Sequence, residues 1–264
     1  MPENTLINMT LDQLIRLMVV FIRVGPLIFL MPVTGSKGVP IQARALCSFA
    51  VALVLAPVID LPEGTLPATA TGFFLFVGKE IILGATLSLF AQLIFAAVEI
   101  AGQMCGIQMG LGVAGTMDPQ SGTQTSLIGY FWNICAVLIF LAINGHHIFF
   151  RAMLESFRHI PPGGVHFSAA TFEAMVKGGS WMFLMAVKIM TPITAALFFS
   201  QVAMGIIAKT VPQIPILIVA LPLNIGLGLV LTGMGMVFLA PLLISGFNTM
   251  GRMLGALTSG LGGM

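Results

Sequence analysis

Hydrophobic residues are gathered into six long blocks along the chain, separated by short polar or proline-containing stretches. Most blocks approach the ~20 residues that a helix needs to cross the hydrocarbon core of a bilayer. They do not alternate apolar and polar positions as a half-buried strand would. Because lipid offers no partner for an open backbone, helices are predicted rather than strands. The blocks cover residues 14–31, 45–59, 73–100, 127–143, 181–204 and 216–244.

Proline residues interrupt these blocks at both ends of the chain. A proline inside a helix removes a backbone hydrogen bond and clashes with the preceding turn. In a membrane, such interruptions persist where neighbouring protein satisfies the freed groups. The pattern therefore predicts an all-α, polytopic integral membrane protein of about six kinked helices that form hairpins within a larger assembly. The prolines expected to break helices are Pro26, Pro32, Pro40, Pro57, Pro62, Pro67, Pro192, Pro212, Pro215, Pro222 and Pro241.

Composition agrees with a membrane location and excludes several function classes. Hydrophobic residues make up 58% of the 264 positions, and charged residues only 8%. A soluble domain carries about 25% charged residues, so this chain cannot cover its surface for water. The net charge of +2, without any Lys/Arg run, argues against nucleic-acid binding. The three cysteines, Cys47, Cys105 and Cys135, lack the spacing of a metal or redox site.

Charged residues inside the apolar blocks are the first candidate site residues. Such charges are costly in lipid and by default mark a function or a protein contact. A proton or ion relay usually needs several carboxylates on facing helices, and only Glu80 and Glu99 are available. Pairing with charges on neighbouring subunits, or extension to the membrane interface, is the preferred interpretation. The candidates for buried or subunit-contact charges are Arg16, Arg23, Lys79, Glu80, Glu99 and Lys188.

The segment between the third and fourth blocks is rich in glycine and then in polar residues. Gly102, Gly106 and Gly110 lie four apart, a spacing that lets helix backbones approach closely. Residues 118–126 carry mostly uncharged hydrogen-bonding groups, and their proline and glycine predict a loop. Neighbouring methionines are flexible enough to seal an irregular opening. A pore plug is therefore one interpretation of the segment, and a solvated turn is the other.

Residues 144–164 contain two adjacent histidines and a predicted amphipathic helix. Consecutive residues on a helix point in different directions, unlike the paired histidines of H-E-x-x-H, so His146 and His147 do not predict a metal site. The helix, over residues 148–160, is of the kind found at a membrane surface or subunit interface. Its apolar face is expected to hold Phe150, Leu154 and Phe157, and its adjoining charged face Arg151, Glu155 and Arg158.

Catalytic motifs are missing from the sequence. Residues 110–115 match G-x-G-x-x-G, but no strand is predicted before them and no acidic residue follows at the required distance. A nucleophile elbow, a P-loop and a paired-carboxylate motif are absent as well. We therefore predict a protein that is not an enzyme and that binds no cofactor or metal.

Several segments together resemble the FliR family of flagellar export-gate proteins and its virulence-system counterparts, named SctT. The resemblance is collinear over nearly the whole chain, and its central and Asn-Gly-His-His segments are specific in combination. The residues that carry it lie in 23–26, 35–40, 108–112, 118–122, 144–147, 155–157, 161–163 and 211–213, with Pro32, Arg44 and Gln124.

This resemblance implies a structural channel subunit without chemistry of its own. It implies partners FliP and FliQ, each in several copies, with FlhB at the entrance, in a helical assembly at the flagellar basal body of the bacterial inner membrane. Unfolded flagellar subunits would be exported through it. Residues 1–175 would be the FliP-like part of the single domain and residues 176–264 the FliQ-like part.

The resemblance also places a pore-plugging loop at about residues 106–122. The loop would contain Gly106, Gln108, Met109, Gly110, Gly112, Met117, Asp118, Pro119, Gln120 and Gly122. The glycines Gly102, Gly106 and Gly110 are expected to serve helix packing beside it.

A secondary transporter for a small solute or ion is the alternative function. It would use broken helices that meet at the middle of the membrane. Such a protein often shows two similar halves with matching interruptions, and no such repeat is visible in this chain.

Overall fold

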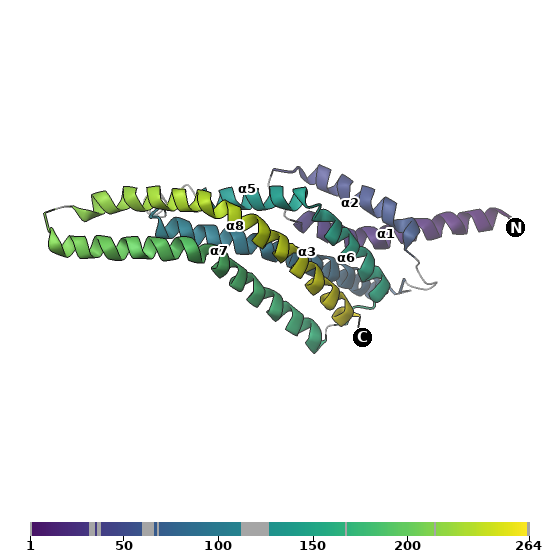
Figure 1. Cartoon of the computed structure of the whole chain (residues 1–264). Coiled ribbons are helices and arrows are strands. Elements are labelled where there is room, and N and C mark those ends of the chain that lie inside the picture. The colour runs from purple at the N-terminus through teal and green to yellow at the C-terminus, as the bar shows by residue number, and fades with distance from the viewer. Residues whose placement is uncertain are drawn as a thin grey trace. The chain divides into compact units, whose positions relative to one another are not determined.

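The computed structural model describes residues 2–31, 35, 38–59, 66–67, 69–111, 127–166, 168–213 and 215–262. Every regular element in these residues is a helix (Figure 1). The predicted all-α fold is therefore confirmed. The helices are α1 (Pro2–Leu30), α2 (Ile41–Leu55), the 3-10 turn η1 (Ala56–Val58), α3 (Ala70–Gln108), α5 (Leu127–Ala142), α6 (His146–His159), α7 (Ala169–Thr210) and α8 (Ile216–Leu261).

Five of the helices are long and apolar enough to cross a membrane. The helices α5 and α6, bent by 68°, make a sixth candidate if they are taken as one broken span. The bend contains Asn144, whose φ of 55° is a left-handed conformation that asparagine tolerates better than most residues. The prediction of a polytopic membrane protein with about six helices is confirmed. The five spans are Asp12–Leu30, Ile41–Val58, Ala70–Gln108, Ala169–Thr210 and Ile218–Leu261.

Several of the prolines that interrupt the apolar blocks lie inside continuous helices instead of ending them. They are Pro26 in α1, Pro192 in α7, and Pro222 and Pro241 in α8. One proline costs a helix a single hydrogen bond, whereas ending the helix in lipid would leave many more groups unsatisfied. The other described prolines do lie at helix ends or turns: Pro40, Pro57, Pro67, Pro212 and Pro215. Pro32 and Pro62 lie outside the described residues.

The chain divides into two compact units, each assembled from separate stretches of sequence. Unit 1 contains Met1–Leu93, Gly145–Gly178 and Thr249–Met264, and unit 2 contains Ile94–Asn144 and Gly179–Asn248. The helices α3, α7 and α8 contribute to both units. The predicted division near residue 175 concerns likeness to FliP and FliQ rather than contacts, and it stays a prediction.

Unit 1 has a core of apolar side chains from α1, α3 and α6. On α1, Val20, Val24 and Leu27 are buried at the three- and four-residue spacing of one helix face. On α3, Leu83 and Leu87 are buried in the same way. The side chains on these faces are the ones removed from lipid and water, which stabilises the packing of the three helices.

The apolar face of α6 differs from the predicted one by about one residue. The side chains of Phe149, Met153 and Phe157 are buried, whereas those of Phe150 and Leu154 are only half-buried. Phe150 and Leu154 keep part of their surface exposed, and the predicted placement of their face at a membrane surface or subunit interface stays a prediction. Both sets follow helical spacing, and the sequence pattern alone does not distinguish them. The face that is buried is the one that also carries Ser156, a residue with a buried polar partner described below.

Unit 2 is built around a cluster of three aromatic rings and a long hairpin. The ring centroids of Phe95 and Phe140 lie 5.6 Å apart. The Phe247 centroid lies 5.7 Å from that of Phe95 and 5.2 Å from that of Phe140. Such separations are favourable for aromatic packing. The α7–α8 hairpin is joined by a hydrogen bond of 3.0 Å between the Ser200 hydroxyl and the Asn224 side-chain oxygen.

Large apolar side chains on the α7–α8 hairpin are exposed. Phe199 is 70% exposed and Phe238 is 74% exposed. Exposed apolar side chains of this kind suit lipid or another apolar protein surface better than water.

Candidate functional site

The predicted pore loop follows the end of α3, where Gly110 terminates the helix. Gly110 has a φ of 85°, in the left-handed region that favours glycine. The Leu111 amide donates to the Gly106 carbonyl at 3.0 Å, and the Gly110 amide donates to the Ile107 carbonyl at 3.0 Å. This pair of bonds is the Schellman motif, which satisfies the last carbonyls of a helix. Gly110 therefore ends the helix, and the packing role expected for it stays a prediction.

Gln108, one of the predicted loop residues, is bonded to helix α7. The Gln201 side-chain amide donates to the Gln108 carbonyl at 3.1 Å and lies 3.5 Å from its side-chain oxygen. Both contacts lie at an exposed position, where a hydrogen bond contributes about 0.5–1.5 kcal/mol. The end of α3 is thereby fixed to α7 before the loop begins.

Met109 is wholly buried and packs against Gly228 of α8. A Cβ atom at residue 228 would lie 2.6 Å from Met109 Cε and 2.8 Å from Met109 Sδ. Contacts so short are not tolerated without movement of the methionine, so the absence of a side chain at Gly228 makes room for Met109. The residue before the loop is therefore held in a slot of α8.

The helices on either side of the loop, α3 and α5, cross closely at two glycines. A Cβ atom at Gly102 would lie 2.8 Å from the Gly129 nitrogen and would collide with the Gly129 Cα atom. In the other direction, a Cβ atom at Gly129 would lie 3.3 Å from the Glu99 carbonyl oxygen. Small residues at such a crossing let two backbones approach. This crossing brings together the helices that lead into and out of the loop.

Most of the predicted loop lies outside the described residues. This applies to Gly112, Met117, Asp118, Pro119, Gln120 and Gly122, whereas Gly102, Gly106, Gln108, Met109 and Gly110 are described. Gly102 and Gly106 are buried positions within α3. The described part of the site is therefore the attachment of the loop, formed by the end of α3 with α7 and α8.

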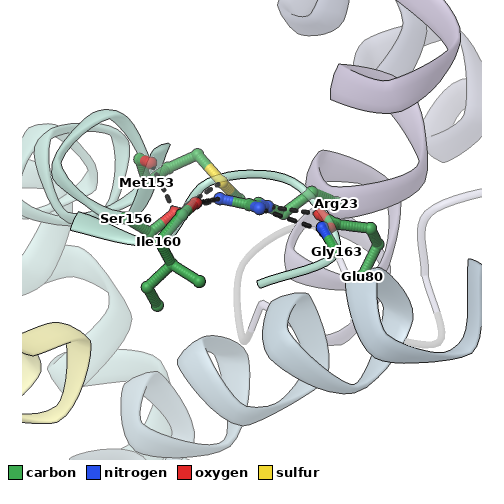
Figure 2. A network of polar contacts seen from close by, with 6 residues as sticks. All are labelled: Arg23, Glu80, Met153, Ser156, Ile160 and Gly163. Atoms are coloured by element: carbon green, nitrogen blue, oxygen red, sulfur yellow. Dashed lines mark hydrogen bonds and ion pairs between the residues drawn. The ribbon is translucent and has the colours of Figure 1, made fainter. Parts of the chain in front are cut away.

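A second polar site lies in unit 1, where Arg23 of α1 and Glu80 of α3 form a buried ion pair (Figure 2). Neither side chain has any exposed surface. Arg23 Nε donates to Glu80 Oε2 at 2.5 Å, and the second guanidinium nitrogen donates to Glu80 Oε1 at 3.1 Å. This two-point geometry matches a planar guanidinium to a carboxylate. The two predicted charges thus pair with each other within the chain.

The same two side chains hold α6 and the turn after it. Arg23 donates to the Ile160 carbonyl at 3.2 Å and lies 3.5 Å from the Ser156 hydroxyl. Glu80 Oε1 accepts a hydrogen bond of 2.7 Å from the Gly163 amide. Figure 2 shows the guanidinium lying between Glu80 on one side and Ser156 and Ile160 on the other. We call these five residues the Arg23 network.

Two further features complete the surroundings of Arg23. Its guanidinium carbon lies 3.9 Å from the centre of the Phe157 ring, within range of a cation–π interaction. On α3, Gly84 lies against the Arg23 carbonyl, and a Cβ atom there would collide with that oxygen. The charge of Arg23 is therefore satisfied on several sides, as a buried charge requires.

Proteins of similar sequence indicate the family of the chain and thus the function that these two sites serve. Residues 14–250 match the family described as bacterial export proteins, family 1. The flagellar biosynthetic protein FliR of Bacillus subtilis (strain 168) is 33% identical over 234 residues, which cover 85% of this chain and 87% of that protein. The chain belongs to the FliR family. FliR of Escherichia coli (strain K12) is 29% identical over 220 residues, covering 83% of this chain and 84% of the relative. FliR of Aquifex aeolicus (strain VF5) is 26% identical over 220 residues, with 83% of this chain and 84% of the relative covered.

The remaining predicted charges of this FliR-family chain occupy different surroundings. The Lys79 amine donates to the Gly163 carbonyl at 3.2 Å, at the exposed edge of the Arg23 network. Glu99 is half-buried, and the Gln103 amide lies 3.5 Å from its carboxylate. Arg16 is half-buried beside a cavity between α1 and α2. Lys188 is exposed on α7. Contacts of these residues with neighbouring subunits stay a prediction.

The histidines of this FliR-family chain lie at the start of α6. The His146 and His147 ring centroids are 4.4 Å apart, with the rings at 63°. Among the described residues, no group of three or more His, Cys, Asp or Glu side chains could hold a metal ion.

Several residues of both sites were not singled out from the sequence. Gly84, Gly228, Gly129 and Gln201 each meet a residue far away in the chain, and a single sequence gives no signal for such pairs. Gly163 follows the helix predicted over residues 148–160, and its bond to Glu80 was not foreseen. The one signal in the sequence that could have identified these residues is their type. A glutamine or glycine inside an apolar block adds no apolar surface facing lipid, which suggests a contact with another helix.

Proposed function

We propose that this chain is a structural channel subunit of the flagellar type III protein export gate. In this proposal it lies at the basal body in the bacterial inner membrane and combines with several copies of FliP and of FliQ. FlhB lies at the entrance, and other export-apparatus proteins surround the gate. The chain closes and nucleates this assembly, unfolded flagellar proteins pass through it, and no catalytic step is assigned to it. The observation that carries the proposal is the match to FliR proteins along nearly their full length.

The geometry at the end of α3 supports a closing role for the loop near residues 106–122. A plug must be fixed at its base while its tip can be displaced by a passing chain. Met109 is held by Gly228 and Gln108 by Gln201, so the base is attached to two helices. Methionine fills irregular space and re-packs readily, and Met117 lies further along the loop in the sequence.

The surface of the chain supports its place in a hetero-oligomer. Exposed apolar residues on the α7–α8 hairpin need lipid or a partner, and an assembly of similar hairpins offers both. Continuous helices with internal prolines, such as α7 and α8, suit such packing because neighbouring chains can satisfy the freed carbonyls.

Purification of the tagged chain from its native membrane tests the proposal. Mass spectrometry of the isolated complex, with its intact mass, is expected to find one copy of this chain with several FliP-like and FliQ-like chains. A monomer or homodimer without such partners would contradict the proposal and favour a solute transporter.

A further inference from the structure

Unit 2 contains an apolar pocket between α5, α7 and α8 that no residue of the described chain fills. Its volume is about 210 Å³, larger than the ~150 Å³ apolar cavity that holds a benzene molecule in an engineered protein. The buried floor is formed by Trp132, Ile193 and Leu239, and the exposed rim by Lys188, Met234 and Phe238.

Two polar groups of this pocket lack partners in the described part of the chain. The Lys188 amine, on the rim, makes no hydrogen bond or ion pair with the described residues. Trp132 is 2% exposed, and its indole nitrogen has no acceptor among the described residues. A buried N–H group without an acceptor is costly, and so is an unpaired ammonium beside an apolar wall. Because the Trp132 nitrogen has no accessible surface, the Lys188 amine is the group that an occupant of the pocket can reach, and an anionic group would pair with it.

The position of Lys188 along α7 fits one edge of a bilayer. Residues 189–208 contain no charged side chain, and Lys209 follows them. At 1.5 Å per residue these twenty residues are about 30 Å long, the thickness of the hydrocarbon core. The two lysines bound an uncharged segment as long as the hydrocarbon core is thick, and in a helix that crosses this core their amines would reach opposite interfaces. The pocket begins at the Lys188 end, where a lipid headgroup would meet its acyl chain.

We propose that the pocket binds an anionic phospholipid. The phosphate lies at the Lys188 amine, and one acyl chain occupies the space between Ile193 and Leu239. A free anion would leave the apolar pocket empty, and an uncharged apolar molecule would leave Lys188 unpaired. An amphiphile with an anionic head satisfies both requirements, and the membrane supplies it at this depth.

Photolabelling of the full chain tests this site. The purified chain, with or without the chains that accompany it, is reconstituted in phosphatidylcholine vesicles containing a small fraction of phosphatidylglycerol with a diazirine in its acyl chain. A parallel sample carries diazirine-labelled phosphatidylcholine. Peptide mapping is expected to place the label on the pocket residues of α5, α7 and α8. Labelling there should favour phosphatidylglycerol by about fivefold, the preference that one basic residue gives near an anionic surface.

Four variants separate the contributions. Lys188→Gln should abolish the fivefold preference, and Lys188→Arg should retain it. Lys209→Gln, on the same helix at the far interface, should leave it unchanged. Gly235→Leu places a side chain in the pocket, because a Cβ atom there already lies 3.6 Å from Ile193, and it should lower pocket labelling by both lipids.

Three outcomes would overturn the proposal. The first is equal pocket labelling by both lipids, because the pocket would then not select an anionic head. The second is a preference that survives Lys188→Gln. The third is an unlabelled pocket in a chain whose lipid-facing surface is labelled, as expected if a protein segment fills it. None of these results depends on whether the chain purifies with partners, so the test is separate from that of the export-gate proposal.

Discussion

Arg23 Nε lies 2.5 Å from Glu80 Oε2, and neither side chain has any exposed surface. The pair joins helices α1 and α3, which are 57 residues apart at this point in the chain. Because Arg23 also reaches Ile160 and Glu80 reaches Gly163, the pair fixes the end of α6 and its following turn to both helices. Buried charges are thus used within the chain to hold three helices together.

We predict that breaking this pair by one substitution is more harmful than removing both charges. Arg23→Met should lower the free energy of unfolding by about 3 kcal/mol or more, because it leaves Glu80 buried and unpaired. The double variant Arg23→Met/Glu80→Met should regain part of the loss. Thermal or denaturant unfolding in detergent, evaluated as a double-mutant cycle, measures the coupling.

The exposed pair Glu173–Lys177 on α7 is the matched control for this cycle. Its N–O distance is 2.8 Å, but both side chains are more than 60% exposed. Removal of either charge should have no measurable effect on unfolding, because water solvates the remaining partner. Equal effects at the two pairs would contradict a special role for the buried one.

We predict that the α3–α5 crossing does not tolerate a methyl group. Gly102→Ala should destabilise the chain by about 1–3 kcal/mol, because the new Cβ atom would press on the backbone of Gly129. Gly78→Ala in the same helix has nothing within 4 Å of its Cβ atom and should be neutral or slightly stabilising. Thermal unfolding of the two variants in the same detergent checks the difference, and equal unfolding temperatures would contradict the close crossing.

We predict that the slot for Met109 controls the base of the proposed plug. Gly228→Val should displace Met109 and raise the ion permeability of cells or vesicles that contain the assembled gate. Gly226→Val, two residues earlier on α8 with open space around it, should leave permeability unchanged. Potassium efflux or proton influx, measured at matched amounts of complex, distinguishes the variants. An increase for both would indicate general disruption of α8 instead.

The helices could be predicted from the sequence because length and apolar content are local properties. Block 73–100 lies within α3 and block 127–143 nearly coincides with α5. The prolines of α1, α7 and α8 could not be placed in the same way, because a proline ends a helix in water more readily than in lipid. Which side chains of α6 are buried depends on the helices it packs against. The spacing of its apolar residues fits both Phe149 with Met153 and Phe150 with Leu154, so the sequence does not decide between these two faces.

The candidate sites were predictable only as groups of residues. The cost of burying charge identified Arg23 and Glu80 separately, but their pairing depends on how α1 and α3 pack. Likewise, the sequence showed that Gly102 and Gly110 are unusual, while the structure gives them different tasks. Gly102 lets α5 approach, and Gly110 ends α3 in a left-handed conformation. Met109 stood out as flexible, and its partner Gly228 carried no local signal.

Deletion of residues 112–122 shows whether the loop closes the pore. This change keeps the Gly110 end of α3 and the Met109–Gly228 contact, so the helices around the loop should still assemble. The measurement is ion flux through membranes that contain the purified variant complex, with subunit composition verified by intact mass. We predict that the variant complex has unchanged composition and conducts ions in the absence of an exported chain, whereas the unaltered complex stays tight. A correctly assembled deletion variant that remains as tight as the unaltered complex would contradict the closing role of the loop.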